Sequence, residues 1–477
     1  MSWEDSMERK SAHLVGICGA GMKALAEVLD GMGWQLSGSD LMPASPAITS
    51  LTLHGLAFSR GHSASHVSEN TQCLIYSPAI RPDNPERQEA ARRGLPQWSY
   101  GEMIGRLMRD RTGICIAGTH GKSTTTAMVG WILSVAGRDP AVLVGAELCD
   151  GGYSGRSGHG DLLVVESCEF NRSFLDFRPR YAAVLNVEPD HFDCYADLPS
   201  LVSAFQEFAR GVSSNGVLLI NSDSVPCRDV AGASDARVVT FGMSPTADWH
   251  VENVRENVAG AQFDIIRRVP AVSDGSMADK PLTVPWGLVQ LRLHGEHNVQ
   301  NALAAAALCA EIGVSSREII GALRSFGGVK RRFEVVRESN GVILIDDYAH
   351  HPTAVRATLK TAREVYGGRR IWCAFQPHQI SRTLALLDDF AASFDDCDEL
   401  LVAPVFAARE QVTDEPRQVS IELVRRVVAR GGNARYVESL DQIITTVEDA
   451  ARPGDVLIAM GAGDIDRIHH EYIRKIL

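Results

Sequence analysis

Short apolar runs alternate with amphipathic stretches along most of the chain, and the alternation is clearest beyond residue 340. Continuous apolar runs of this length predict buried strands, and apolar positions three and four residues apart predict helices. The expected strands are 342–348, 370–376, 399–406 and 455–463, and the expected helices are 353–366, 381–394 and 421–430. Strands that alternate with helices in this way predict a doubly wound, largely parallel sheet.

Two earlier blocks show the same alternation. The first extends to about residue 107, and the charged stretch 109–111 predicts a linker. The second contains apolar runs at 113–117, 161–166 and 181–187, which we interpret as parallel core strands. A less regular stretch at 240–290 predicts an antiparallel excursion.

The fold class is therefore α/β with three domains, which we expect at 1–108, 109–328 and 329–477. We expect the first and last to be Rossmann-like, and the central one to be a mostly parallel sheet with a phosphate loop. A length of 477 residues agrees with this division, since one ordinary domain is much shorter.

Composition narrows the class of protein. Hydrophobic residues make up 45% and charged residues 22%, as in a globular protein. No apolar run reaches the roughly 18 residues of a membrane span, and the charged N-terminus lacks the apolar core of a secretory signal. A net charge of −12 argues against broad nucleic-acid binding. Ten cysteines without a CxxC pair indicate free thiols in a reducing cytoplasm, and nothing specifies an oligomeric state.

The stretch from residue 13 to 40 is close to the dinucleotide-binding fingerprint. A short apolar run precedes Gly19, Gly21 and Ala24, and Asp40 follows about 20 residues on. In that fingerprint, glycine backbone approaches a diphosphate at a helix N-terminus and the acid holds a ribose. An NAD-dependent dehydrogenase is therefore one interpretation, and a domain that binds another diphosphate ligand is a second.

The expected strand at 113–117 leads directly into "GTHGKSTT". Gly118 and Gly121 permit tight backbone turns, Lys122 can reach the β- and γ-phosphates of a nucleotide, and Ser123 can ligate Mg²⁺. Only two residues separate the glycines, where the standard phosphate loop has four. The strand before the loop and the helix after it favour phosphate binding over an ordinary helix N-terminus.

Two further expected strands end in side chains that can ligate a metal. Glu166 closes the run "LLVVE". After the next strand, "NVEPDHFD" supplies Asn186, Glu188, Asp190, His191 and Asp193. Taken singly, each acid is more often a solvated strand cap. Beside a phosphate loop, the set suits Mg²⁺ and favours ATP chemistry.

Seven motifs occur in order over most of the chain: "GTHGKSTT", "VVES.E...SFL", "NVEPDHFD", "GEHNVQNALAA", "GVKRRFE", "IDDYAHHPT" and "FQPHQISR". With these motifs the sequence resembles the Mur ligase family, which makes the peptide stem of the bacterial cell-wall precursor. The resemblance implies a domain each for a UDP-substrate, ATP and an amino acid. It also implies a cytoplasmic reaction in which ATP turns a carboxylate into an acyl phosphate that an amine then attacks. Within the family, the sequence is most similar to the branch that joins L-alanine to UDP-N-acetylmuramate.

The resemblance also assigns roles to matched residues. It implies ATP and two Mg²⁺ ions, one on Ser123 and Glu166 and a second cation on His191. The implied catalytic residues are Lys122, His191, His350 and Arg382. The implied ATP contacts are Gly118, Thr119, His120, Gly121, Lys122, Ser123, Thr124, His297, Asn298, Asn301, Arg331, Arg332 and Asp347. The implied UDP-substrate contacts are Gly19, Ala20, Gly21, Met22, Asp40, His62, Ser77 and Asn84, and the implied amino-acid contacts are Tyr348, His350, His351, His378 and Arg382.

One departure from several relatives concerns a lysine. Relatives that add later amino acids carry a carbamylated lysine shortly after the DH motif. Here no lysine lies between Lys122 and Lys280, and Gln206 falls near that position. This chain therefore has no lysine that could form a carbamate bridge, and the alanine-adding branch of the family also lacks one.

Three alternatives remain at this point. A branch that recycles the tripeptide L-Ala-γ-D-Glu-meso-diaminopimelate onto UDP-N-acetylmuramate is slightly favoured by "GICG" and "ESCEF", whereas "FQPHQISR" favours the alanine branch. An NAD-dependent dehydrogenase leaves the phosphate loop and the HHP and QPH clusters unexplained. A non-catalytic nucleotide-binding regulator is opposed by the presence of Lys122, Glu166 and His191 together.

Overall fold

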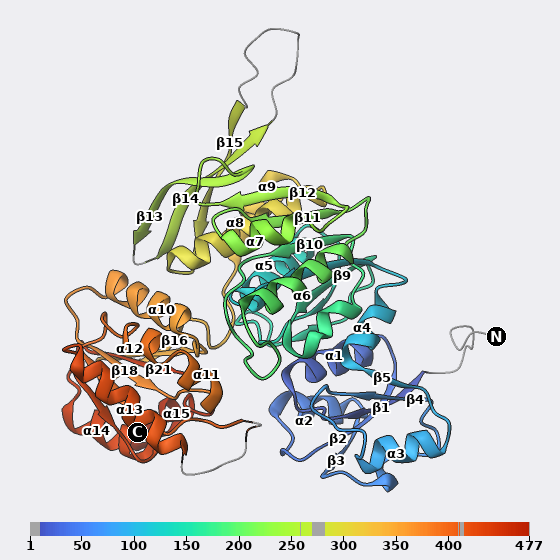
Figure 1. Cartoon of the computed structure of the whole chain (residues 1–477), viewed down its shortest axis with the longest axis horizontal. Helices are drawn as coiled ribbons and strands as arrows, with labels where there is room; N and C mark the ends of the chain where they lie inside the picture. Colours follow the sequence, from blue (N-terminus) through green and yellow to red (C-terminus); the bar gives the residue numbers. More distant parts are fainter. Residues whose placement is uncertain (1–9, 258, 270–281, 409, 411–414, 477) are drawn as a thin grey trace.

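The computed structural model describes residues 10–257, 259–269, 282–408, 410 and 415–476. Three β-sheets, each covered by helices, follow one another along the chain (Figure 1). The sheets confirm the α/β class. The N-terminal sheet contains β1–β5, the central sheet β6–β15 and the C-terminal sheet β16–β21.

The N-terminal sheet is parallel throughout, in the order β3-β2-β1-β4-β5. Its strands are β1 (Ser11–Val15), β2 (Gln35–Asp40), β3 (Ala57–Arg60), β4 (Cys73–Tyr76) and β5 (Gln97–Ser99). Its helices are α1 (Ala20–Gly31), α2 (Pro46–Leu53), η1 (Ala64–His66), α3 (Pro85–Arg92) and α4 (Tyr100–Leu107). Strand β1 is central and fully buried, and it ends at Val15 because Gly16 adopts φ 79°. The chain thus enters the glycine loop at the carboxyl edge of the sheet, where ligands bind in such folds.

The central sheet has the order β15-β14-β13-β12-β11-β10-β6-β9-β7-β8. Its strands are β6 (Thr112–Ala117), β7 (Ala141–Leu143), β8 (Gly155–Arg156), β9 (Leu162–Ser167), β10 (Tyr181–Val184), β11 (Val217–Asn221), β12 (Arg237–Gly242), β13 (Trp249–Asn257), β14 (Gly260–Val269) and β15 (Leu282–Leu291). Its helices are α5 (Lys122–Val135), η2 (Phe170–Asp176), α6 (Leu198–Arg210), α7 (Val225–Ala231), α8 (Glu296–Glu311) and α9 (Ser316–Ser325). Strands β6 and β9–β12 pair in parallel through their apolar runs.

Strands β13, β14 and β15 pair antiparallel, which confirms the excursion expected at 240–290. They form an arm that extends away from the rest of the molecule (Figure 1). Strand β10 is shorter than the expected 181–187, because the chain turns towards the phosphate loop after Val184. The side chain of Asn186 accepts the N–H of His120 at 2.7 Å and donates to its carbonyl at 3.1 Å.

The C-terminal sheet has the order β16-β17-β21-β18-β19-β20, and only its edge strand β16 is antiparallel to its neighbour. Its strands are β16 (Glu334–Ser339), β17 (Val342–Asp347), β18 (Ile371–Phe375), β19 (Glu399–Val402), β20 (Ala434–Tyr436) and β21 (Val456–Met460). Its helices are α10 (Pro352–Val365), α11 (Ile380–Ala385), α12 (Leu387–Ala391), α13 (Glu415–Ala429), α14 (Leu440–Ala450) and α15 (Arg467–Ile476). The single helix expected at 381–394 is wrong, because Leu386, with φ −115° and ψ 24°, separates α11 from α12.

The N-terminal and central sheets are joined through α1 and β8. The carboxylate of Glu27 accepts the backbone N–H groups of Ser154 and Gly155 and the hydroxyl of Ser154. All ten cysteines are free thiols. Among the described helices, none combines the length and apolarity needed to cross a membrane.

Candidate active site

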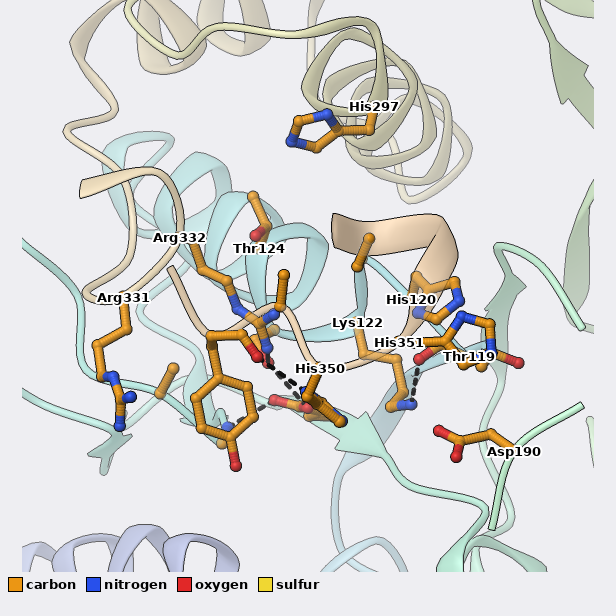
Figure 2. Close-up of a pocket in the computed structure, with 18 of the residues that line it drawn as sticks. Thr119, His120, Lys122, Thr124, Asp190, His297, Arg331, Arg332, His350 and His351 are labelled. Carbon is orange, nitrogen blue, oxygen red and sulfur yellow. Dashed lines mark hydrogen bonds between the residues drawn. The ribbon is translucent and has the colours of Figure 1, made fainter. Parts of the chain in front are cut away.

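A cavity of about 2020 Å³ lies between the three sheets, and most of the predicted site residues line it. The predicted residues in its wall are Gly19, Ala20, Gly21, Met22, Ser77, Thr119, His120, Gly121, Lys122, Ser123, Thr124, Glu166, His191, His297, Asn298, Asn301, Arg331, Arg332, Asp347, Tyr348, His350, His351, His378 and Arg382. Figure 2 shows the phosphate loop facing Arg331, Arg332, His350 and His351 of the C-terminal segment. The structure therefore brings residues from all three segments to one site.

The phosphate loop is shaped by two glycines with positive φ. Gly118 adopts φ 144° and Gly121 adopts φ 78°, conformations that other residues rarely adopt. A Cβ on Gly121 would lie 2.4 Å from the side-chain oxygen of Asn301, so glycine also permits close packing of α8. The loop delivers the N-terminus of α5, with its unpaired amides and positive dipole end, to the cavity. This is a binding site for an anion such as a phosphate.

The ammonium of Lys122 is surrounded by oxygen atoms of the chain. It donates to the carbonyls of Gly118 and Thr119 and lies 3.0 Å from a carboxylate oxygen of Glu169. Burial would lower the pKa of Lys122, but Glu169 and other nearby acidic groups raise it, and the net direction is upward. The lysine is therefore charged and can exchange its carboxylate partner for a phosphate.

The side chains of Ser123 and Glu166 meet as the Mg²⁺ interpretation expects. The hydroxyl of Ser123 donates to Glu166 at 2.9 Å, and the backbone N–H of Gly145 donates to the other oxygen of the same carboxylate. Nη2 of Arg332 lies 3.3 Å from the Ser123 hydroxyl. A hydroxyl and an oriented carboxylate at the start of the phosphate-loop helix are oxygen donors that suit Mg²⁺.

His191, the third predicted metal ligand, lies beside Glu169. Its Nε2 is 3.7 Å from Glu169 Oε1, and its Nδ1 is buried without a hydrogen-bond partner among the described residues. Burial lowers the pKa of His191, so the ring is neutral and can offer a lone pair to a cation. Its backbone has φ 51°, an uncommon conformation of the kind found at functional sites.

Glu169 was not among the predicted site residues, whereas Glu188 and Asp190 were predicted only as members of the group of acids and imidazole that suits Mg²⁺. Glu169 lies between Lys122 and His191, and Glu188 and Asp190 line the cavity next to the C-terminal segment. The sequence did carry a signal for Glu169, since a second acid follows Glu166 by three residues in "ESCE". Glu188 and Asp190 stand within the quoted motif "NVEPDHFD", but sequence spacing did not specify which of its acids faces the cavity.

At the end of the site that the C-terminal segment supplies, Arg382 lies next to His378 and His350. Arg382 is 2% exposed, and its Nε donates to Asp190 of the central segment at 2.7 Å. Its Nη1 contacts the ring nitrogen and the carbonyl of His378. The ring of His350 lies 5.6 Å from that of His378. Burial, together with Arg382, lowers the pKa of His350 well below its usual value, so this imidazole is neutral.

Two of the predicted ATP contacts, Asn298 and Asn301, form a buried polar network at the start of α8. Asn301 donates to Asn298 at 3.2 Å, and Asn298 donates to the carbonyl of His294 at 2.8 Å. Burial lowers the pKa of His297 to about 4, which keeps the ring neutral. A neutral imidazole on a rigid helix start can stack on, or hydrogen-bond to, an aromatic base.

Arg331 and Asp347 have structural contacts in addition to their place in the cavity wall. Arg331 donates to the carbonyls of Gly461 and Gly463 at 2.8 and 3.2 Å. The carboxylate of Asp347 accepts the backbone N–H of Phe333 at 2.8 Å and that of Ala349 at 2.7 Å. These bonds fix the loops on either side of β17. The predicted ATP contacts of both residues stay predictions.

Three predicted UDP-substrate residues, Asp40, His62 and Asn84, are not among the residues that line the cavity. Asp40 accepts the N–H of Cys18 at 2.8 Å and so ties β2 to the glycine loop. Asn84 caps α3, and His62 contacts Ser39 and Glu86, each at 3.1 Å. These side chains support the fold of the N-terminal segment, and their contact with a ligand stays a prediction.

These features define a class of protein. A phosphate loop, oxygen donors for Mg²⁺, a buried arginine and neutral imidazoles share one cavity between three α/β units, which is the arrangement of an enzyme that brings a nucleotide to other substrates. Family models agree: Mur ligase family, catalytic domain matches residues 11–112, Mur ligase middle domain matches 116–309, and Mur ligase, glutamate ligase domain matches 331–463.

Known proteins with similar sequences extend over almost the whole chain. A UDP-N-acetylmuramate–L-alanine ligase of Salinibacter ruber is 36% identical over 98% of this chain and 95% of that protein. One of Sorangium cellulosum is 38% identical over 96% of this chain and 94% of that protein.

Solved structures agree with these relatives. A UDP-N-acetylmuramate–alanine ligase from Thermotoga maritima has a TM-score of 0.77 at 27% identity, covering 98% of both chains. A murein peptide ligase from Psychrobacter arcticus has a TM-score of 0.71 at 26% identity, again over 98% of both chains. The chain belongs to the Mur ligase family, and the dehydrogenase interpretation of residues 13–40 is not retained.

Proposed function

We propose that this chain is an ATP-dependent ligase that joins the lactyl carboxylate of UDP-N-acetylmuramate to the amino group of L-alanine. The observation that carries the proposal is the single cavity, in which the glycine loop after β1, the phosphate loop after β6 and the imidazole–arginine cluster after β17 and β18 face one another. The similar sequences over nearly the full length support the choice of substrates. The product is a precursor of the bacterial cell wall, made in the cytoplasm, where ATP and UDP-sugars are available.

The proposed reaction has two steps, a phosphoryl transfer and an attack by the amine. The carboxylate attacks the γ-phosphorus of ATP, the bond to ADP breaks, and an acyl phosphate forms. The amine then attacks the acyl carbon, and a tetrahedral intermediate expels phosphate. Lys122 would stabilise the transferring phosphoryl group, and Arg382 would hold an amino-acid carboxylate in the fork of its guanidinium. The main contribution of these side chains is positioning and charge neutralisation.

The chain's oxygen and nitrogen donors fit Mg²⁺ beside the phosphate loop. Ser123 and Glu166 would hold one ion, and His191 would contribute to a second, with Glu169 beside it. Bound Mg²⁺ supplies neutralisation of phosphate charge. We propose two ions. We also propose His350 as the group that accepts the proton of the incoming amine, because its ring is neutral and lines the cavity. The proposed domain boundaries are 1–108, 109–328 and 329–477.

An oxygen-18 transfer experiment tests the proposal. UDP-N-acetylmuramate labelled with ¹⁸O in its lactyl carboxylate is turned over with ATP, Mg²⁺ and L-alanine, and the released phosphate is analysed by mass. One carboxylate oxygen should appear in phosphate, because the acyl phosphate breaks at its acyl–oxygen bond. Phosphate without label would contradict an acyl-phosphate route.

The tripeptide-recycling ligase is kept as a second candidate, because the murein peptide ligase structure is nearly as similar to this chain as the alanine ligase structure. Both candidates use the same UDP-substrate and ATP and differ only in the amine. Phosphate release driven by the tripeptide and not by L-alanine would favour the second.

A further inference from the structure

Two histidines and one glutamate form a cluster where the central and C-terminal segments meet. Nε2 of His120 lies 3.4 Å from Oε2 of Glu188, and Nδ1 of His351 lies 3.9 Å from the same oxygen. The ligand atoms of all three residues are within 4.8 Å of one another. The two imidazoles lie side by side in Figure 2, with ring centres 4.6 Å apart.

The tautomer of His351 is set by its other contacts. Its Nε2 lies 3.1 Å from the carbonyl oxygen of Pro189, which can only accept, so Nε2 carries the proton. Nδ1 therefore has a lone pair, and it points towards the carboxylate of Glu188. The N–H of Thr353 donates to Nδ1 at 3.3 Å, which is beyond the usual length and competes only weakly. Two electron-rich atoms thus face each other with no proton between them.

Contacts with neighbouring residues also orient His120 and Glu188. The backbone of His120 is fixed by both polar atoms of the Asn186 amide, and its Nε2 faces the carboxylate of Glu188 at 3.4 Å. The carboxylate of Glu188 accepts the hydroxyl of Thr353 at 2.6 Å. Metal-ligating histidines and carboxylates in proteins have such outer contacts, which hold the ligand atom in position.

We propose that His120, Glu188 and His351 form a binding site for a divalent transition-metal ion such as Zn²⁺. With bonds of about 2.1 Å, the donors of a tetrahedral ion lie about 3.4 Å apart, so only small movements separate this cluster from a ligating set. Two imidazoles select Zn²⁺, Co²⁺ or Ni²⁺ over Mg²⁺, which takes oxygen ligands. Three protein ligands leave a fourth position open to the cavity, which all three residues line.

The site differs from the one proposed for Mg²⁺. It shares none of Ser123, Glu166 and His191, and it joins two segments of the chain: His120 and Glu188 belong to the central segment and His351 to the start of α10. An ion there connects the phosphate loop to the C-terminal segment and stabilises their contact. The inference does not rest on the ligase reaction.

Co²⁺ binding to the full chain tests the proposal, since Co²⁺ replaces Zn²⁺ and is visible by absorption. The titration is done in excess Mg²⁺, which occupies the oxygen-donor site, and in a Cys168→Ser background. That background removes the thiol of the neighbouring group Cys168, Glu169 and His191. The expected result is one equivalent of Co²⁺ with visible bands of a four- or five-coordinate ion, displaced by Zn²⁺.

Matched variants identify the ligands. Glu188→Gln keeps the acceptor for Thr353, and His351→Asn keeps a residue that can cap α10. Both should lose the bound equivalent while keeping the wild-type circular dichroism, and Thr353→Val should weaken binding about tenfold. The control His159→Asn, at an exposed histidine, should bind as the parent does.

A second readout uses thermal unfolding. Zn²⁺ should raise the unfolding midpoint of the parent and of His159→Asn, and should not raise that of Glu188→Gln or His351→Asn. Equal Co²⁺ stoichiometry and affinity in the parent and in both ligand variants would overturn the proposal. So would complete displacement of Co²⁺ by Mg²⁺.

Discussion

At the scale of single residues, the buried cations of the site are each paired with a carboxylate of the chain. Lys122 forms an ion pair with Glu169 at 3.0 Å, and Arg382 forms one with Asp190 at 2.7 Å. A buried charge without a partner is costly, and both of these cations have a carboxylate partner within the chain. A phosphate or an amino-acid carboxylate can take the place of that partner without leaving the cation unpaired.

Replacement of Lys122 by Met should lower amino-acid-dependent phosphate release about 100-fold or more, because the transferring phosphoryl group loses its nearest cation. Release of inorganic phosphate under saturating substrates measures the effect. Arg425→Met serves as the control, since Arg425 is exposed and pairs with Glu422 on the same helix, α13. Equal loss in both variants, or none in Lys122→Met, would argue against a role at the phosphate.

Replacement of Arg382 by Lys should raise the KM for the amino acid about tenfold or more and leave the KM for ATP nearly unchanged. A lysine keeps the charge beside Asp190 but cannot bind a carboxylate through two parallel hydrogen bonds. Initial rates with each substrate varied separately measure the two constants. A change confined to the KM for ATP would place Arg382 at the nucleotide instead.

Single residues also show where prediction from sequence ended. Lys122, Ser123 and Glu166 were found because a strand, a glycine turn and an acid at the next strand end are local patterns. Glu188 and Asp190 were predicted within the group that suits Mg²⁺ but were given no individual role, because their contacts are with α10 and α11, which lie about 160 to 190 positions later in the sequence. Contacts of that kind are not encoded in local spacing.

At the scale of elements, parallel strands place the functional groups at one edge of their sheet. The apolar periodicity of the sequence predicted most of these strands. The expected strands at 113–117, 161–166 and 370–376 agree closely with β6, β9 and β18. The edge strand β16 was not predicted, because its exposed residues lack a clear apolar run. The break between α11 and α12 at Leu386 was missed, since no glycine or proline marks it.

Strand β17 contains an unusual carboxyl group. Burial and the neighbouring acids raise the pKa of Asp346 from 3.8 to about 7, although Arg331 opposes the shift. The unfolded chain loses this proton at lower pH than the folded chain does, so the stability of the fold falls as pH rises from about 4 to 7. The difference corresponds to at most about 4 kcal/mol.

Asp346→Asn should remove this pH dependence. The variant should be close to the wild type in stability at pH 4 and more stable at pH 8, because asparagine has no proton to lose. Calorimetric unfolding midpoints at the two pH values measure the effect. A wild type and variant with parallel midpoints across this range would contradict a raised pKa at Asp346.

The contact between α1 and β8 depends on a residue without a side chain. A Cβ on Gly155 would lie 2.0 Å from the carbonyl oxygen of Ala24. Gly155→Ala should therefore destabilise the protein by about 1–3 kcal/mol and weaken UDP-substrate binding, because α1 begins at the glycine loop. Chemical unfolding and ligand titration measure both effects.

Gly232→Ala is the matched control for this change. Gly232 follows α7 with φ −66°, and a Cβ there would meet no atom within 4 Å. The control should be as stable as the wild type or slightly more so. Equal behaviour of the two alanine variants would show that α1 and β8 are not closely packed.

At the scale of the whole molecule, residues from all three segments line one cavity. Figure 1 shows the three sheets, and Figure 2 shows residues that the central and C-terminal segments supply. The order of the sequence motifs along the chain predicted that three segments contribute to one site. The family models match residues 11–112, 116–309 and 331–463. What they could not predict is how the parts meet. That depends on contacts such as Glu27 with Gly155 and Arg382 with Asp190, whose partners are far apart in sequence.

The most direct test of the account is ATP-dependent phosphate release from the purified chain across a panel of amines. The panel contains L-alanine, glycine, L-serine and the L-Ala-γ-D-Glu-meso-diaminopimelate tripeptide, each with and without UDP-N-acetylmuramate. We expect phosphate release to require UDP-N-acetylmuramate and L-alanine together. Release with the tripeptide and not with L-alanine, or release that does not depend on UDP-N-acetylmuramate, would contradict it.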